Sequence, residues 1–339
     1  MKKILIILSI IASPFIGKSQ VDFGNFLEAS AQDANTLLEN YLEPAFLGFG
    51  YGINSGWYNT AKPHKLFGFD ITPTFTLAMV PSSGEFFRLN DSDYTSLRVD
   101  PNGPTDSQGN LIRDTPTLFG PNLNADFLPM LEYTDPEGNS YSISTPTGLG
   151  LEESIPFNAV PSGMIQVGIG LMKNTDLKIR IVPAIESENE YSFEMFGIGV
   201  MHDLKQWVPG FKQLPLDVSG FVGWNRMTTQ LFLDADAPDQ IAQFQTNGFT
   251  LQGLVSKQLS ILTVFGGVGI ANTKTTFNML GTYDTEAGTV TDPIDFSFLS
   301  TGPRINLGFR LKLLILTLHA DYAIQKYNTL TIGAGFSIR

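Results

Sequence analysis

Strict alternation of apolar and polar residues over the C-terminal segment 304–339 constrains the fold of this chain more than any other feature. Apolar side chains recur at every second position of three runs, namely Ile305, Leu307, Phe309 and Leu311, then Leu316, Leu318, Ala320, Tyr322 and Ile324, then Leu330, Ile332, Ala334, Phe336 and Ile338. A period of two residues predicts β-strands with one apolar and one polar face. No helical stretch adjoins these runs to cover the apolar face. We therefore expect lipid to be its solvent.

The first residues have the features of a secretory signal peptide. Lys2 and Lys3 precede the apolar run 4–12, and Gly17 and Ser19 provide small residues before a cleavage site. We therefore predict a signal peptide over residues 1–19, with a retained membrane anchor as the alternative. No Cys follows the apolar run, which excludes lipoprotein processing.

Composition excludes several classes of protein. The absence of Cys excludes disulfides and thiolate metal sites. No later run reaches the roughly 20 apolar residues that a membrane-spanning helix needs. The formal net charge is −12, and an acidic chain is a poor partner for nucleic acid, whose phosphates need a basic surface. Thirty-three Gly, abundant Phe and few charges favour an all-β fold.

One helix is predicted, over residues 22–43. Its apolar residues recur at spacings of three and four, and Pro44 is expected to end it. Its polar face carries no Lys or Arg but five acids, namely Asp22, Glu28, Asp33, Glu39 and Glu43. We expect segment 20–45 to be either a plug that enters the barrel from the periplasmic side or a periplasmic helix docked on the barrel mouth.

The remainder, 46–339, is predicted to be a transmembrane antiparallel β-barrel of about twelve strands, with fourteen as the alternative. The nine strands before the last three are predicted at about 46–58, 66–79, 85–98, 162–173, 177–186, 191–202, 216–232, 242–257 and 260–278. The weak strand 85–98 is included because a barrel with both ends in the periplasm needs an even number. In strand 46–58 glycines alternate with large apolar residues, which suggests a glycine-lined inner wall against which the helix lies.

The longest connection, 99–160, is acidic and rich in proline. Between Pro81 and Val160 there are twelve Asp plus Glu and three Arg. Loops of this length are usually functional or disordered. We predict an extracellular loop that folds over or into the pore.

A set of basic residues, together with one histidine, is predicted to face the lumen: Lys178, Arg180, Arg304, Arg310, Lys312 and His319. This luminal basic patch could contact an anionic ligand. Alternatively, its charges could pair with Asp70, Asp217, Asp321 or the acidic helix in a structural network, and the pairing is the favoured interpretation.

Neither catalysis nor metal binding is indicated. His319 and Asp321 share the inward face of one strand, but no Gly-x-Ser-x-Gly motif supplies a nucleophile. Acidic residues such as Asp91, Asp93 and Asp100 do not follow the spacing of a calcium loop. We expect no enzyme activity, no metal and no cofactor.

Two prolines interrupt strands that should be fully paired. Pro73 and Pro183 each remove one ladder hydrogen bond, which is costly in hydrocarbon. Such residues usually lie near a rim or a bulge. The alternative is a gap in the barrel wall.

The exported N-terminus, the glycine-rich alternation and the C-terminal strand with Phe336 resemble the outer-membrane β-barrel superfamily. The helix, the glycine-lined strand and the proline-interrupted strand together resemble the layout of the long-chain fatty-acid (FadL-like) transporters. That family has an Asn-Pro-Ala element where this chain has Glu43-Pro44-Ala45, and it has fourteen strands, so no binding residues are carried over. The stretch 56–64, Gly-Trp-Tyr-Asn-Thr-Ala-Lys-Pro-His, is similar to an uncharacterised family of exported proteins.

These resemblances imply passive uptake of hydrophobic or amphipathic small molecules across the bacterial outer membrane. The alternative is a structural or surface-interaction barrel with a filled lumen. The expected partners are outer-membrane lipid, lipopolysaccharide, the barrel-assembly machinery and a hydrophobic ligand, with no nucleic acid.

Overall fold

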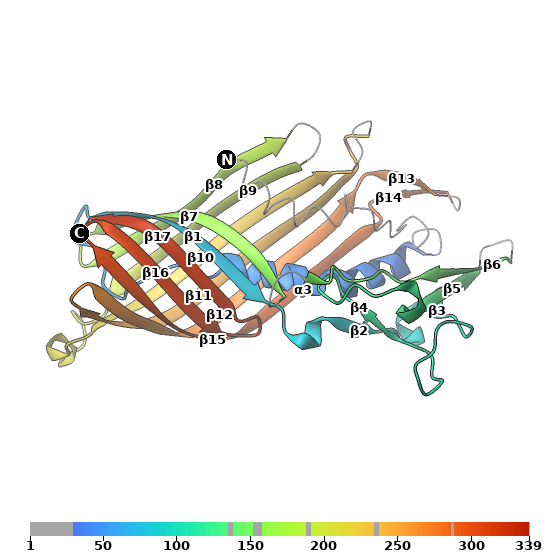
Figure 1. Ribbon diagram of the computed structural model, residues 1–339. Coiled ribbons are helices and arrows are strands. Elements are labelled where there is room, and N and C mark those ends of the chain that lie inside the picture. The colour runs from blue at the N-terminus through green and yellow to red at the C-terminus, as the bar shows by residue number, and fades with distance from the viewer. Residues whose placement is uncertain are drawn as a thin grey trace.

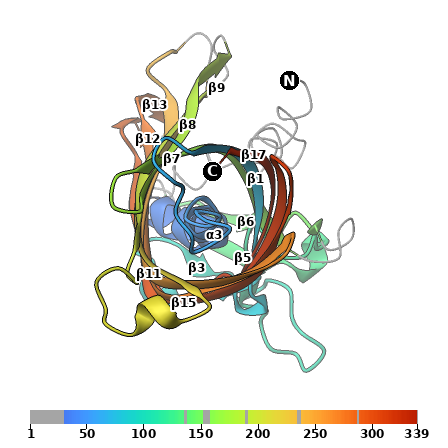
Figure 2. The ribbon, with the colours of Figure 1, turned by 90° about the vertical axis from the view of Figure 1, so that its left-hand side faces the viewer.

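The computed structural model describes residues 30–134, 138–151, 158–187, 191–233, 237–285 and 288–338. Its centre is a closed antiparallel barrel of ten strands in the order β1-β17-β16-β15-β12-β11-β10-β9-β8-β7 (Figures 1 and 2). The strands are β1 (Phe69–Met79), β7 (Ala159–Leu171), β8 (Thr175–Ser187), β9 (Tyr191–Asp203), β10 (Asp217–Phe232), β11 (Ile241–Leu259), β12 (Leu262–Leu280), β15 (Ile294–Leu313), β16 (Leu316–Ile324) and β17 (Thr329–Ile338).

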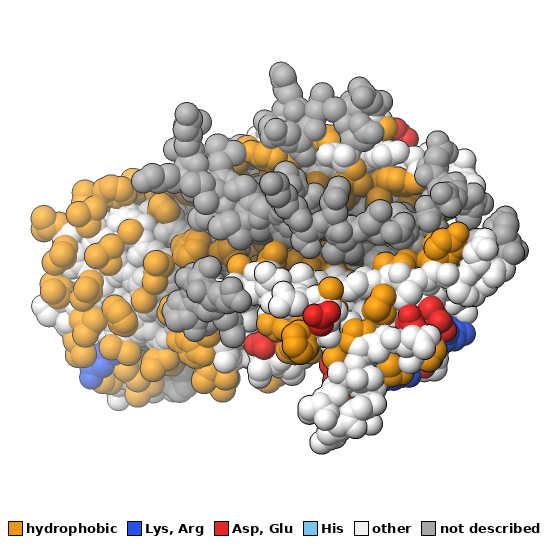
Figure 3. Space-filling view, turned by 45° about the vertical axis from the view of Figure 1, so that its right-hand side comes forward, with side chains coloured by type: hydrophobic (Ala, Val, Ile, Leu, Met, Phe, Trp, Pro, Cys, Tyr) orange, Lys and Arg blue, Asp and Glu red, His pale blue; other side chains and the backbone are white. Residues whose placement is uncertain are grey.

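The alternation that predicts the barrel separates its two faces. In β15, Ile305, Leu307 and Phe309 point outward and are at least half exposed, whereas Arg304 and Arg310 are buried in the lumen. Apolar side chains cover the part of the barrel wall seen at the left of Figure 3. The prediction of an all-β barrel with an apolar outer face is thus confirmed. In the part of the chain that the structure describes, no helix is both long and apolar enough to cross a membrane.

A single long helix, α3 (Ala31–Ile53), occupies the lumen. Figure 2 shows it end-on inside the ring of strands. Ser30 caps its N-terminus by accepting a hydrogen bond from the Asp33 amide. The helix continues through Pro44, which the sequence predicted as its end, and residues 22–29 of the predicted helix lie outside the described residues.

The predicted strand 46–58 is therefore wrong, and the structure gives the reason for its glycines. Gly48 and Gly52, one helical turn apart, face β7, where an added Cβ would overlap Val160 or lie 2.6 Å from the Ser162 hydroxyl. On the opposite side of the helix, an added Cβ on Gly50 would overlap Thr273 of β12. Glycines two apart point to opposite sides of a helix. The alternating glycines thus let the helix pack closely against β7 on one side and against β12 on the other.

The two ends of the barrel differ in their connections. Short turns join β7 to β8, β11 to β12 and β15 to β16, and residues with positive φ (Asn174, Ser260 and Leu314) lie in them. We call this the short-turn end, and the opposite end, with the connections 80–158 and 281–293, the long-loop end. The first turn of α3 lies at the long-loop end, because Asn35 accepts a hydrogen bond from the Asp295 amide. Residues 54–68 then continue to the short-turn end, where Phe67 and Gly170 are hydrogen-bonded. The chain thus crosses the barrel before β1 begins.

The long loop carries small sheets of its own. β2 (Phe86–Arg88) pairs with β4 (Asp114–Pro116), and β3 (Arg98–Val99) joins β5 (Met130–Thr134) and β6 (Ser140–Ser144). The connection 281–293 contains a hairpin of β13 (Thr282–Thr285) and β14 (Gly288–Thr291). Predicted strand 85–98 supplies only such loop strands. The barrel therefore has ten strands where the sequence predicted about twelve, because 46–58 and 85–98 do not enter it.

Adding one methyl group at Gly50 tests how tightly the helix is held. Ala is favoured over Gly by about 1 kcal/mol in a helix, so propensity alone predicts that Gly50→Ala stabilises the protein. Because the methyl group would overlap the stiff side chain of Thr273, we expect a net loss of about 1–3 kcal/mol of unfolding free energy in detergent. Gly302→Ala, where an added Cβ meets open space, is the matched control. The double variant Gly50→Ala/Thr273→Ala should recover the loss, and a stabilised single variant would contradict this packing.

Candidate functional site: the plugged lumen and a cavity in the wall

Arg180 of β8 holds the C-terminal end of the luminal helix. Its guanidinium is fully buried and donates hydrogen bonds to the carbonyls of Ile53 (2.7 Å) and Ser55 (2.6 Å). Its Nε donates to Gln166, and its planar group lies 3.6 Å from the centre of the Trp57 ring. Carbonyl groups at the end of a helix carry partial negative charge, and Arg can bridge several of them. Arg180 therefore fastens α3 to the wall.

Further polar contacts fix the segment after the helix, residues 54–68, which we call the descending segment. Arg304 donates to the hydroxyl of Ser55, and the Tyr58 hydroxyl lies 2.7 Å from Asn306 Oδ1. Toward the short-turn end, the His64 amide and ring both contact Asp176, at 2.7 and 2.9 Å. The descending segment is thus hydrogen-bonded to several strands, and it contains the stretch 56–64 singled out in the sequence.

The residues of the predicted luminal basic patch differ in their burial. Lys178, Arg180, Arg304, Arg310 and His319 are buried inside the barrel, and Lys312 is partly buried. Lys178 lies 3.8 Å from Asp176. His319 and Asp321 share the inward face of β16, and Asn306 approaches Asp321 at 3.5 Å.

The predicted meeting of these basic groups with the acidic face of the helix is not found among the described residues. Glu43 lies 3.8 Å from Lys326 at the long-loop end, and Asp33 contacts loop amides. Arg180 and Arg304 instead meet the C-terminal carbonyls and Ser55. These contacts could not be predicted from the sequence, because every residue has a backbone carbonyl and no residue type marks the ones that are used.

Helix α3 also packs on a cluster of aromatic side chains. The ring of Phe46 lies within 5.4–6.3 Å, centre to centre, of four phenylalanines on β11, β12 and β15, namely Phe244, Phe277, Phe296 and Phe298. Tyr51 stacks on Tyr327 and its hydroxyl lies 2.7 Å from that of Ser300. Apolar packing and polar contacts thus fill the lumen together.

Asp33 fastens the other end of the helix to the long loop. Its carboxylate accepts hydrogen bonds from the backbone amides of Thr95, Ser96 and Leu97 and from the Thr95 hydroxyl, at 2.6–2.9 Å. Burial would raise the pKa of this carboxyl, but these four donors together lower it below its usual value. Asp33 therefore stays ionised and links helix and loop.

Other loop carboxylates serve the loop itself. Asp91 accepts from the Val99 amide and Arg113, Asp100 from Ser142, and Asp106 from Asn110. Within the described residues there is no group of three or more carboxylate or histidine side chains placed to hold a metal ion.

The barrel wall is incomplete between β7 and β8. Their pairing runs only from Leu171↔Thr175 to Gln166↔Arg180. Beyond it, residues 159–165 of β7 pair with β1, and residues 181–187 of β8 pair with β9, but not with each other. Figure 1 shows β8 and β9 diverging from β7 toward the long-loop end. A gap in the sheet therefore opens at the level of the helix end.

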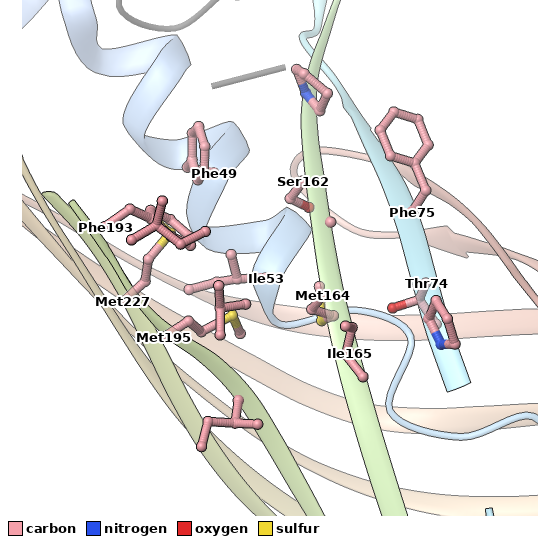
Figure 4. Close-up of a pocket in the computed structure, with 16 residues that line it drawn as sticks. Phe49, Ile53, Thr74, Phe75, Ser162, Met164, Ile165, Phe193, Met195 and Met227 are labelled. Carbon is pink, nitrogen blue, oxygen red and sulfur yellow. The ribbon is translucent and has the colours of Figure 1, made fainter. Parts of the chain in front are cut away.

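A cavity of about 540 Å³ lies at this gap (Figure 4). Its inner lining comes from the helix residues Phe49 and Ile53 and from inward-facing side chains of five strands, namely Thr74, Ser162, Met164, Val182, Phe193, Met195 and Met227. Its outer lining consists of residues on the outward-facing side of the wall, namely Pro73, Phe75, Pro161, Gly163, Ile165, Ile181 and Ile185. The cavity thus reaches from the lumen to the outer surface.

Both predicted wall-gap prolines lie close to this feature. Pro73 lines the cavity, although β1 is paired with β7 at this residue. Pro183 belongs to the stretch of β8 that has no pairing to β7, where the register to β9 also shifts between Val182 and Ile185. Pro161 also borders the gap on β7, and it was not predicted, because it lies just before the predicted strand 162–173. Proline is typical of unpaired strand edges, since it lacks an amide hydrogen.

Comparison with known proteins places the chain in a family and gives distant structural likenesses. A family model described as "Family of unknown function (DUF6588)" matches residues 1–338. No curated protein sequence matches the chain.

Among solved structures, the translocator domain of the autotransporter NalP from Neisseria meningitidis is 11% identical, with 81% of this chain and 90% of that chain covered and a TM-score of 0.26. A loop-deletion mutant of OmpT, an outer membrane protein of Vibrio cholerae, is 9% identical over 80% of this chain and 97% of that chain, with a TM-score of 0.19. A deletion mutant of the monoaromatic hydrocarbon channel TodX is 9% identical over 87% of this chain and 92% of that chain, with a TM-score of 0.16.

The Asp33 contact predicts a pH-dependent link between helix and loop. Because the pKa of Asp33 is lower in the folded protein than the unfolded value of about 3.9, its stabilisation is present above that pH and is lost as the pH falls through the folded pKa. Hydrogen exchange at Thr95–Leu97, corrected for the intrinsic effect of pH, should therefore accelerate only in acid. Asp33→Asn should accelerate it at pH 7 as well, whereas Asp106→Asn, in a separate turn, should leave it unchanged. Unchanged exchange in Asp33→Asn would contradict this role.

Replacing Arg180 by Lys tests the other fastening. Lys keeps the charge but cannot reach both carbonyls and the Trp57 ring with a planar fork. We expect Arg180→Lys to lower the unfolding free energy in detergent by about 1–3 kcal/mol, the usual cost of lost hydrogen bonds to a charged group. The exposed Arg88, paired with Asp114 in the long loop, is the control, and Arg88→Lys should change it by less than about 1 kcal/mol. Equal losses of unfolding free energy in Arg180→Lys and Arg88→Lys would contradict the role of Arg180 in fastening the helix.

Proposed function

We propose that this chain, which belongs to the family of unknown function DUF6588, is an outer-membrane β-barrel for passive uptake of hydrophobic or amphipathic small molecules. In this proposal the ligand passes through the side of the barrel at the β7–β8 gap rather than along the barrel axis. The chain has no enzymatic role.

The apolar outer face of the barrel supports the membrane location. Outward side chains such as Leu307, Leu318 and Ile332 are more than half exposed in the isolated chain. Burying them in lipid removes a large apolar surface from water. The predicted signal peptide, lipid and lipopolysaccharide as surroundings, and the barrel-assembly machinery as partner all accord with this location. The long-loop end would then face outward.

The observation that carries the proposal is the cavity that joins lumen and outer wall. Its lining is almost entirely apolar, and its volume of about 540 Å³ lies within the range of small-molecule sites. The helix and the descending segment fill the axis of the barrel at the same level. A hydrophobic molecule that reaches the cavity thus has a direct path toward the bilayer between β7 and β8.

The luminal basic patch has a structural role in this proposal. Arg180 and Arg304 are engaged by the helix end and Ser55, and Lys178 by Asp176. These contacts keep the plug in place, so that the axial path stays closed while the lateral path remains.

A second candidate function is a structural or surface-interaction barrel without transport. The many hydrogen bonds that the helix and the descending segment make with the wall favour this second candidate. A helix that fills the lumen and is fixed at both of its ends is expected for a barrel that only displays its loops. The two candidates differ in whether the wall gap must open.

Linking the two edges of the gap separates these candidates. The protein has no Cys, so we introduce Ile165→Cys/Ile181→Cys, one on each edge, and join them with a cleavable bismaleimide in whole cells. We expect the link to reduce uptake of the fluorescent probe N-phenyl-1-naphthylamine to the level of cells without the protein, and cleavage to restore it. The control pair, Val167→Cys/Ile179→Cys, lies where β7 and β8 are already paired and should not affect uptake. Unchanged uptake in the linked gap variant would favour the structural barrel.

A further inference from the structure

We infer that the wall cavity selects a neutral hydrophobic molecule with a single hydrogen-bonding oxygen, such as a long-chain alcohol, ketone or ester, and rejects carboxylates. The inference rests on the proposed uptake function, because it assigns the ligand of the same cavity. It narrows the broad class of hydrophobic and amphipathic molecules by the polarity of the lining.

Among the residues that the structure describes, no charged side chain lines the cavity. Moving an ionised carboxylate into an apolar site costs several kcal/mol unless a cation pairs with it. Arg180 stands next to the lining residue Ile181 in the chain, but its donors are engaged by Ile53, Ser55 and Gln166. A carboxylate would have to displace the helix end to reach it. The cavity therefore disfavours anions.

Two hydroxyl groups are the polar features of the lining. Thr74 and Ser162 are only 6% and 4% exposed, and neither Thr74 Oγ1 nor Ser162 Oγ has a hydrogen-bond partner among the described residues. Native proteins rarely leave such groups unpaired, since each costs about 1–3 kcal/mol. A ligand that supplies an oxygen to them would recover this free energy.

The two hydroxyls lie on neighbouring strands of the same part of the cavity wall, so one ligand can approach either of them. Thr74 of β1 pairs with Met164 of β7, and Ser162 is two residues along on the same inward face, which makes Thr74 and Ser162 diagonal neighbours. Gly52 faces Ser162, so no helix side chain competes for that hydroxyl. A hydroxyl both donates and accepts, which suits an alcohol, a ketone or an ester alike.

The rest of the cavity suits an apolar body of variable shape. Met164, Met195 and Met227 line it together with Phe193. Methionine side chains adapt to ligands of different outline because they are unbranched and flexible. The polar group would thus lie at Thr74 and Ser162 and the apolar body among the methionines.

A matched set of ligands tests this assignment. We measure binding of 1-decanol, decanoate and decane to the intact protein in lipid nanodiscs at pH 8, by displacement of N-phenyl-1-naphthylamine and relative to free aqueous concentration. We expect decanol to bind at least tenfold more tightly than decanoate. The variant Thr74→Val/Ser162→Ala should weaken decanol binding about fivefold to thirtyfold and leave decane unchanged. Thr246→Val, whose hydroxyl bonds Thr275 away from the cavity, should leave all three unchanged.

The outcomes separate the ligand class from the uptake function. If decanoate binds as tightly as decanol, or the double variant binds decanol normally, the ligand class is wrong while lateral uptake stands. The cavity-filling Met195→Trp should abolish binding of decanol and decane and uptake of the probe. If Met195→Trp leaves binding and uptake unchanged, the cavity is not the site and the proposed function fails with it.

Discussion

The bond between Arg180 and the end of the luminal helix is the interaction on which the rest of the structure depends. A fully buried guanidinium is costly, and here the carbonyls of Ile53 and Ser55, a glutamine and an indole ring replace its water. The same contacts end the helix at Ile53 and start the descending segment. Removing the helix and the descending segment would break two of the hydrogen bonds of Arg180 and its contact with Trp57, which makes the helix part of the barrel rather than an accessory.

A barrel of ten strands that contains a helix has to adapt its wall. Glycines bring α3 against β7 and β12, and large residues on its remaining surface, such as Phe49, fill the space toward β9 and β10. On this side β8 follows β9 away from β7, and the pairing stops at Gln166. Prolines on both edges reduce the number of unpaired amides. The gap and the cavity thus follow from the packing of the plug.

The sequence revealed the parts of this fold that have a simple period. Strict alternation in 304–339 predicted three strands and the faces of their side chains, because successive residues of each strand point alternately to the outer face and to the lumen. It failed at 46–58, where Gly48, Gly50 and Gly52 alternate with Phe49 and Tyr51 for a different reason. A helix that is enclosed on all sides has no polar face. The alternation of its glycines with large residues therefore resembles the pattern of a strand. A gap in the wall at Pro73 and Pro183 was one alternative from the sequence, but its place between β7 and β8 could not be predicted, because a proline does not show which strand lies opposite it.

The filled lumen does not argue against uptake, because the plug is fastened in one region and apolar in another. Its polar contacts are concentrated at Asp33 and from Ile53 toward His64, whereas the helix surface that closes the cavity, Phe49 with Ile53, meets methionines and phenylalanines. Apolar contacts are not directional, and methionines repack at small cost. Entry of a ligand would then require side-chain movement at the gap while Arg180 keeps its carbonyl partners. A filled lumen is consistent with uptake for as long as the route runs through the wall.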